Sequence, residues 1–203
     1  MHHYVHQHAQ REAFTFWAGC GAIRRQVFEQ IGGFDEHYAH PSIEDIELGA
    51  RLRDAGLRVW LCRDVQVTHL KEWSLVSMLR SDIRDRALPW SRLILRSGTL
   101  PNDLNVDTVS RKSALAAWVA LVSLVLGFWY PWTWLVTLSA DLVLFLLNAA
   151  LYKFLVQQGG VVLGIAGAGL HTLYLLYSSA IFGAVLILTR LSDTASQKSL
   201  DRL

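Results

Sequence analysis

The charged residues of this chain are confined almost entirely to its first part. Residues 1–112 contain 15 of the 19 lysines and arginines and 14 of the 17 aspartates and glutamates. Residues 113–189 contain two charged residues, Asp141 and Lys153. Because a charge is costly to bury in an apolar medium, this distribution predicts a water-facing part followed by a part embedded in lipid.

The remaining composition excludes several classes of protein. The net charge of +2 is too small to suggest nucleic acid as a partner. The two cysteines, Cys20 and Cys62, are not in C-x-x-C spacing and predict neither a disulfide framework nor a zinc site, which fits a domain facing the reducing cytosol. Residues 1–16 are polar and rich in histidine, so we expect no signal peptide there and a polar, mobile terminus.

The first part of the chain alternates between helical and strand-like stretches, which is typical of an α/β layer. Glycines end the predicted helices because they tolerate the left-handed cap conformation. Ser42 is expected to cap a helix by accepting the amide of Asp45, much as in a capping box. The predicted elements are a strand over 14–23 that runs into a glycine-bearing turn, a helix over 24–31 stopped by Gly32 and Gly33, a helix from Ser42 to Gly56, and strands over 57–61 and 65–68.

Residues 70–96 combine an apolar helical face with several arginines. Apolar side chains recur every three or four residues from Trp73 to Ile94, and Pro89 is expected to divide the stretch into two helices. Such a pattern indicates helices lying in the lipid headgroup region. The alternative is an ordinary surface helix packed on the soluble domain.

Three apolar stretches, 113–130, 132–152 and 161–189, are candidate membrane spans, and the shortest would cover about 27 Å. Tryptophans around Pro131 suit a lipid–water boundary, and Gly160 and Gly164 form a G-x-x-x-G pair continued by Ala168. Basic residues before the first span place the soluble part in the cytosol by the positive-inside rule. We therefore expect a multi-pass protein of the inner or plasma membrane, with about three transmembrane helices and a polar tail.

Asp141 falls within the second predicted span. An ionisable residue at that depth is a functional candidate, with His171 on the third span as its potential partner. The alternative is an inward-facing aspartate that is hydrogen-bonded between helices.

Glu44 and Asp45 lie in the first turn of the helix that follows Ser42. The exposed amides and the helix dipole stabilise a carboxylate there as an anion. Such a group suits a general base that removes the proton of a hydroxyl acceptor. The alternative interpretation is simple helix capping.

Three motifs follow one another in the first part: FWAGCGAIRR at 16–25, IGGFDE at 31–36 and IEDIELGARL at 43–52. In order and spacing they resemble the second half of an inverting family 2 glycosyltransferase with the GT-A fold. The resemblance implies that Gly19, Cys20 and Gly21 form the turn that lines the donor–acceptor site, with Arg24 as a further substrate contact. It also implies that Asp45 is the catalytic base and that Glu44 supports the site or contacts the acceptor.

The resemblance further implies a divalent metal ion, Mg²⁺ or Mn²⁺. In that family a histidine after the last core strand helps to bind the metal, and His69 occupies the matching place. Neutral imidazole can bind such an ion, although a lone histidine at a strand end is also commonly structural.

The chain departs from the family in one important respect. The D-x-D motif and the nucleotide-binding strands of the family's first half have no counterpart here, so the chain is expected to lack most of the donor pocket. The missing half would belong to a longer protein or to a second chain. The Q-x-x-R-W motif of processive synthases is also absent at 86–90, which favours transfer of single sugars.

The sequence thus predicts an α/β plus membrane-α protein in four parts: the C-terminal part of a GT-A domain (1–69), interfacial amphipathic helices and linker (70–112), transmembrane helices (113–191) and a polar tail (192–203). The resemblance implies a hexosyltransferase-type enzyme of cell envelope glycan synthesis that uses a nucleotide-sugar donor and a lipid-linked or membrane-associated acceptor. Two alternatives remain: a non-catalytic membrane protein whose soluble part is a docking module, and a transporter built around Asp141.

Overall fold

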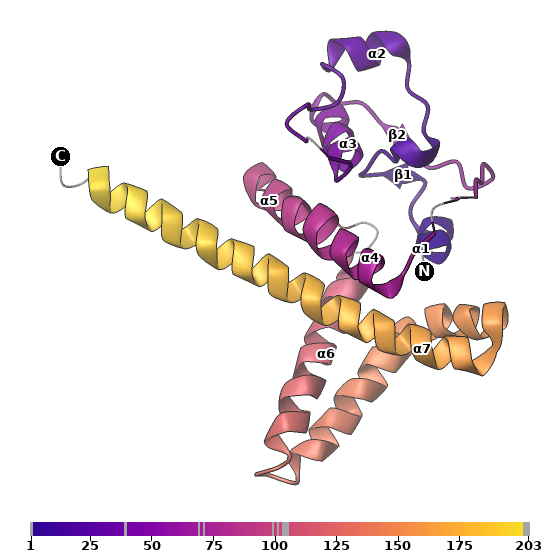
Figure 1. Cartoon of the computed structure of the whole chain (residues 1–203), viewed down its shortest axis with the longest axis vertical. Coiled ribbons are helices and arrows are strands. Elements are labelled where there is room, and N and C mark those ends of the chain that lie inside the picture. Colours follow the sequence, from indigo (N-terminus) through magenta and orange to yellow (C-terminus); the bar gives the residue numbers. More distant parts are fainter. Residues whose placement is uncertain are drawn as a thin grey trace. The chain divides into compact units, whose positions relative to one another are not determined.

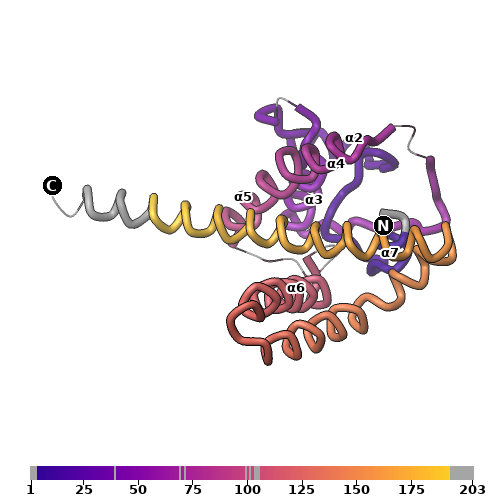
Figure 2. The backbone as a smooth tube through the Cα atoms, turned by 60° about the horizontal axis from the view of Figure 1, so that its bottom comes forward, coloured from indigo at the N-terminus to yellow at the C-terminus, as the bar shows by residue number. Residues whose placement is uncertain are grey.

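The computed structural model describes residues 2–38, 40–68, 70, 72–98, 100, 102 and 106–200. The chain forms two compact units (Figures 1 and 2). We call Ala9–Asp103 with Ile181–Leu203 the polar unit, and Met1–His8 with Leu104–Ala180 the apolar unit. Each unit is described by itself.

The polar unit is mostly helical. Its elements before residue 103 are β1 (Glu12–Ala13), the 3₁₀ turn η1 (Ala18–Cys20), α2 (Arg25–Gln30), α3 (Glu44–Asp54), β2 (Val59–Trp60), α4 (Leu75–Arg80), the π-helix η2 (Ser81–Ala87) and α5 (Leu88–Ser97). Phe16, Leu48 and Leu52 form a small buried cluster in this unit, with side chains of α2 packed against it.

The sheet of the polar unit is a two-residue antiparallel ladder, in which Glu12 faces Trp60 and Ala13 faces Val59. The predicted strands over 14–23 and 65–68 are therefore wrong, since these segments are not strands among the described residues. A strand persists only where its backbone groups find partners. Beyond the ladder the amide of Leu61 donates to the carbonyl of Arg11, but the amide of Val65 only closes a local turn with Cys62, and Val65 and Val67 are each 64% exposed.

The two helices predicted over 24–31 and from Ser42 to Gly56 are found as α2 and α3, and their glycine ends are confirmed. Gly32, after α2, has φ +84°, and Gly56, after α3, has φ +75°. The amide of Leu57 donates to the carbonyl of Leu52 at 2.9 Å, which closes the last turn of α3. A residue with a β-carbon would be strained at either glycine, because positive φ brings the side chain against the backbone.

The predicted break at Pro89 takes another form. α4, η2 and α5 follow one another without interruption, and Pro89 lies in the first turn of α5. A proline in the interior of an α-helix removes one amide donor and crowds the preceding turn. The wider π turn of η2 accommodates this ring, so the chain changes its helical pitch where two separate helices were expected.

The apolar unit contains α1 (His2–His8), α6 (Thr108–Leu126) and α7 (Thr133–Leu200) as far as Ala180. The expected mobile terminus is instead helical from residue 2, and the ring of Tyr4 lies 5.3 Å from that of Phe154. By length and composition alone, two helices of the described chain could cross a membrane: α6 and Thr133–Ser192 of α7.

A kink at Gly159 and Gly160 divides α7 into a first arm, residues 133–158, and a second arm, residues 161–200. Gly160 has φ +76°, outside the helical range. The kink lies where the sequence predicts the boundary between the second and third spans. Within the apolar unit the second arm turns back along the first (Figures 1 and 2).

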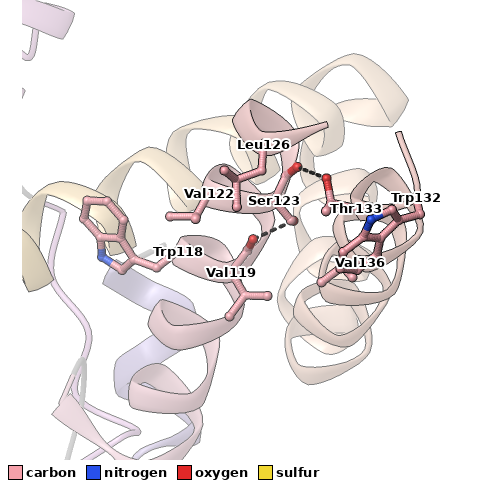
Figure 3. A pocket seen from close by; sticks show the side chains of 8 residues that line it. All are labelled: Trp118, Val119, Val122, Ser123, Leu126, Trp132, Thr133 and Val136. Atoms are coloured by element: carbon pink, nitrogen blue, oxygen red, sulfur yellow. Dashed lines mark hydrogen bonds between the residues drawn. The ribbon is translucent and has the colours of Figure 1, made fainter. Parts of the chain in front are cut away.

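Buried hydroxyl and amide groups join α6 to the first arm as an antiparallel hairpin. Asn148 Nδ2 donates to Ser113 Oγ at 2.8 Å near one end of the pair, and Ser123 Oγ lies 2.9 Å from Thr137 Oγ1 near the other. Figure 3 shows the closing turn, where Thr133 Oγ1 donates to the carbonyl of Ser123. Mostly apolar side chains there line a hollow of about 380 Å³. Such polar pairs are typical of helices that associate in lipid.

The second arm packs closely on the first through small residues. A β-carbon at Gly167 would lie 2.6 Å from Leu155 Cδ1, and one at Gly164 would clash with Val156. Of the predicted small face, Gly164 meets the first arm and Ala168 packs against its buried cluster, whereas a β-carbon at Gly160 would meet nothing within 4 Å. His171 is buried and bonded to Tyr152 at 3.2 Å, whereas Asp141 is exposed. The inward-facing interpretation of Asp141 is thus wrong.

Candidate functional site

The carboxylate of Asp45 lies at the glycine-bearing turn. Its Oδ2 accepts the backbone amide of Ala18, the first residue of η1, at 3.1 Å. Its Oδ1 accepts the amide of Ile46 at 2.8 Å. Asp45 and Ala18 are 27 residues apart in sequence. The structure therefore brings the start of α3 and the turn together, as the resemblance implies.

Gly49 makes this approach possible. It lies one helical turn after Asp45, on the same side of α3. A β-carbon at Gly49 would be 2.5 Å from the backbone nitrogen of Phe16 and 2.9 Å from the Cα of Thr15. The segment before η1 thus rests directly on the α3 backbone, and this contact sets the distance from Asp45 to Ala18.

The start of α3 is anchored by contacts other than those predicted. α3 begins at Glu44 with Ile43 as its cap residue, and the side chain of Ile43 makes no capping hydrogen bond. The amide of Ser42 donates to Glu44 Oε2 at 2.7 Å, and the hydroxyl of Ser42 donates to the carbonyl of Asp85 in η2 at 2.6 Å. The predicted Ser42 cap is wrong because this hydroxyl is used in a contact 43 residues away.

Burial dominates the electrostatics of Asp45. The pKa of Asp45 is raised above its ordinary value, mainly because burial disfavours the charged carboxylate, and the nearby charge of Glu44 raises it further. The amides of Ala18 and Ile46 lower the pKa but only partly offset this burial. The first-turn position was expected to stabilise the anion. The net effect is the opposite and makes the Asp45 carboxylate a stronger base.

Glu47 and Arg51 hold the helix end beside this site. Arg51 pairs with both carboxylate oxygens of Glu47 at 2.7 Å. It also donates to the carbonyls of Ile31 at 2.6 Å and Gly33 at 2.7 Å. Such a forked arrangement of charge-assisted bonds fixes the end of α2 against α3. Glu47 thus has a structural partner and does not join Asp45 in a paired acid site.

The other predicted substrate contacts lie on or near η1. Gly19, Cys20 and Gly21 are exposed, and Cys20 is a free thiol. Arg24 is also exposed, just before α2. Among the described residues, no hydrogen bond or ion pair joins Arg24 to Asp45 or Glu44. The structure therefore brings Asp45, Glu44 and the turn together but leaves Arg24 outside this contact set.

The described residues contain no group of three histidine, cysteine, aspartate or glutamate side chains that could hold a metal ion. His69, the predicted ligand, lies outside the described residues. The predicted metal site is therefore not tested by the described residues.

Sequence reasoning missed Gly49, the Ala18 amide and the Ser42 contact with Asp85. The sequence does contain a signal for Gly49. A glycine in the interior of a helix lowers its stability by about 1 kcal/mol relative to alanine, so its presence suggests a close packing contact. A backbone amide leaves no such trace, because every residue except proline has one. The role of Ser42 depends on a segment far along the chain.

The chain is similar to proteins of known biosynthetic systems. It is 38% identical over 64 residues to the O-antigen biosynthesis protein RfbC of Myxococcus xanthus, a match covering 32% of this chain and 5% of that protein. It is 27% identical over 131 residues to the succinoglycan biosynthesis protein ExoA of Rhizobium meliloti (strain 1021), covering 58% of this chain and 37% of that protein. The matches thus span well under half of either relative. No solved structure matches the chain.

A family model matches residues 5–182, which include the Asp45 site, α6 and most of α7. The match therefore extends over both units and is not confined to a single motif. On this evidence the chain belongs to glycosyl transferase family 21.

Proposed function

We propose that this chain carries the acceptor side of a GT-A-type enzyme that transfers a sugar from a nucleotide-sugar to a membrane-associated or lipid-linked acceptor, with inversion. The observation that carries the proposal is the carboxylate of Asp45, held at η1 by the amide of Ala18 and made more basic by burial. The family match and the family 2 resemblance supply the reaction class.

In the proposed reaction Asp45 removes the proton of the acceptor hydroxyl. The acceptor oxygen attacks the anomeric carbon of the donor sugar as the bond from that carbon to the diphosphate oxygen breaks on the opposite face. The nucleoside diphosphate leaves with the bonding electron pair, and the proton remains on Asp45. Attack and departure on opposite faces invert the anomeric configuration. A raised pKa suits this role because a stronger base accepts the proton more readily.

The donor would be bound largely outside this chain's own residues. The sequence has no D-x-D motif, so the nucleotide-binding half is supplied by another segment or by a second chain. The role of His69 as a ligand of Mg²⁺ or Mn²⁺ rests on the resemblance alone. If transfer by His69→Ala depends on metal concentration as the wild type does, His69 is not a metal ligand and its role is structural.

The proposed enzyme is a multi-pass protein of the inner or plasma membrane. α6 and the two arms of α7 would each cross the bilayer, and the elements from β1 to α5 would face the cytosol. The apolar composition and length of α6 and α7 support this arrangement. Membrane anchoring would raise the effective concentration of a lipid-borne acceptor at the site.

Residues 72–98 would lie at the membrane surface. Trp73, Leu75 and Val76 are 44%, 56% and 66% exposed in the polar unit, while Arg92 and Arg96, one turn apart, line a hollow with Leu95 and Thr189. We expect a peptide of residues 72–98 to bind vesicles containing phosphatidylglycerol and to dissociate as salt rises. Equal binding to neutral phosphatidylcholine vesicles would leave the segment as an ordinary surface helix.

The test of the proposed function is transfer by the complete protein in membrane vesicles. Nucleotide-sugars labelled in the sugar would be supplied one at a time, and label would be followed into lipid-extractable product. We expect incorporation from one donor class, with a product of opposite anomeric configuration. A product that retains the donor's configuration would exclude a single displacement with Asp45 as base.

A further inference from the structure

Ser42 makes two hydrogen bonds that connect three segments of the polar unit. Its amide donates to Glu44 Oε2 at 2.7 Å, inside the first turn of α3. Its hydroxyl donates to the carbonyl of Asp85, in η2, at 2.6 Å. Ile43, the residue between Ser42 and Glu44 in the sequence, is completely buried. The start of α3 is thus held by the hydrogen bonds of Ser42 and by the burial of the Ile43 side chain.

Pro89 removes one possible helical partner of the Asp85 carbonyl, which accepts the Ser42 hydroxyl. In an α-helix the carbonyl of Asp85 would accept the amide of the residue four positions later, but that residue is Pro89, which has no amide hydrogen. The π turn of η2 lies at the same place. Within η2 the carbonyls accept amides five residues later, as the amide of Leu88 shows by donating to the carbonyl of Ile83, and the Ser42 hydroxyl adds a donor to the Asp85 carbonyl from outside the helix.

We propose that Ser42 is a positioning residue that ties the start of α3, and with it Asp45, to the π-helix η2. This inference rests on the proposed function, because Asp45 is there the base that acts on the acceptor. Asp45 follows Ser42 by three residues, and its carboxylate must meet the Ala18 amide at 3.1 Å. Releasing the start of α3 from η2 would let that first turn move and loosen this contact.

The first test measures the contact without any sugar transfer. In the complete protein in lipid nanodiscs, Ser42→Ala is expected to speed hydrogen exchange at the Ala18 amide about tenfold, as for the loss of one hydrogen bond. Ser42→Thr keeps the hydroxyl and should restore the wild-type rate. Ser97→Ala is the matched control, because the Ser97 hydroxyl donates to the carbonyl of Ile94 in its own helix, α5, at 3.1 Å. Unchanged exchange at Ala18 in Ser42→Ala would overturn the proposal.

A second variant tests the role of Pro89. Pro89→Ala supplies an amide four residues after Asp85, which would compete with the Ser42 hydroxyl for the same carbonyl. In that background, adding Ser42→Ala should change the exchange rate less than about twofold, because coupled residues do not act additively. Independent effects that multiply in the double variant would overturn the link between Ser42 and Pro89.

The transfer assay separates this inference from the proposed function. Ser42→Ala should lower kcat about tenfold with the donor KM unchanged, and Ser42→Thr should restore it. A lower kcat with unchanged exchange at Ala18 would mean that Ser42 acts on the substrate itself, and the positioning role would be lost. Faster exchange at Ala18 with an unchanged kcat would support the positioning role of Ser42. It would also show that Asp45 is not the base of the reaction.

Discussion

Asp45→Asn is expected to lower the rate of sugar transfer about a thousandfold while leaving donor binding intact. A positioned general base typically contributes between about 10² and 10⁴ to the rate. Asparagine keeps one oxygen, which can accept the Ala18 amide, so the geometry at η1 should survive, while the amide of Ile46 loses its carboxylate acceptor. What is lost is the ability to hold the acceptor's proton. The measurement is kcat and donor affinity for the complete protein in membrane vesicles.

The same substitution should not destabilise the fold at neutral pH. Because the pKa of Asp45 is raised in the folded state, the protonated form is favoured by folding. The contribution of this group to stability is therefore fully present below the carboxyl's ordinary pKa and is lost as pH rises through the raised value. Asparagine is neutral at every pH, so we expect the thermal midpoint of Asp45→Asn relative to wild type to rise with pH across this window.

Asp54→Asn is the matched control for both measurements. Asp54 is the last residue of α3 and is exposed, so Asp54→Asn should change neither transfer nor the thermal midpoint at neutral pH. Full turnover in Asp45→Asn would exclude Asp45 as the base. A thousandfold loss of activity together with a fall in thermal midpoint would instead indicate damage to the fold.

The helical skeleton of the polar unit was predictable because its signals are local. Gly32 and Gly56 end α2 and α3 within a residue or two of where the sequence places those ends, and each has the positive φ that favours glycine. The kink of α7 at Gly160 follows the same logic. Each of these features depends on a few consecutive residues, which a single sequence contains in full.

The contacts at the candidate site were not predictable in the same way. The hydroxyl of Ser42 could have capped its own helix, but it donates to the carbonyl of Asp85, 43 positions further along. The pKa of Asp45 likewise depends on how deeply α3 is buried. Burial raises this pKa more than the backbone amides lower it, and the sequence indicates only the amides of the first turn. The strand predicted over 65–68 failed for a related reason, since a strand requires a partner that its own residues do not specify.

Gly49→Ala is expected to destabilise the polar unit by about 3 kcal/mol, which is the cost of forcing a methyl group into a tightly packed contact. On an exposed helix surface the same change would be favourable by about 1 kcal/mol, because alanine is the better helix former. The sign reverses here because the new β-carbon would lie 2.5 Å from the backbone nitrogen of Phe16 and 2.9 Å from the carbonyl carbon of Thr15. Backbone atoms cannot turn aside as a flexible side chain can.

The displaced segment leads directly into Ala18, so the methyl group should also separate the Ala18 amide from the Asp45 carboxylate. We therefore expect kcat to fall about a hundredfold in molecules that remain folded, the scale of a misplacement near 1 Å. Denaturant unfolding of the complete protein measures the stability change. Gly19→Ala is its control, because a β-carbon at Gly19 meets nothing within 4 Å and should change stability by less than about 0.5 kcal/mol. Wild-type stability and transfer in Gly49→Ala would mean that α3 does not rest on the 15–16 backbone, and that the position of Asp45 is set by some other contact.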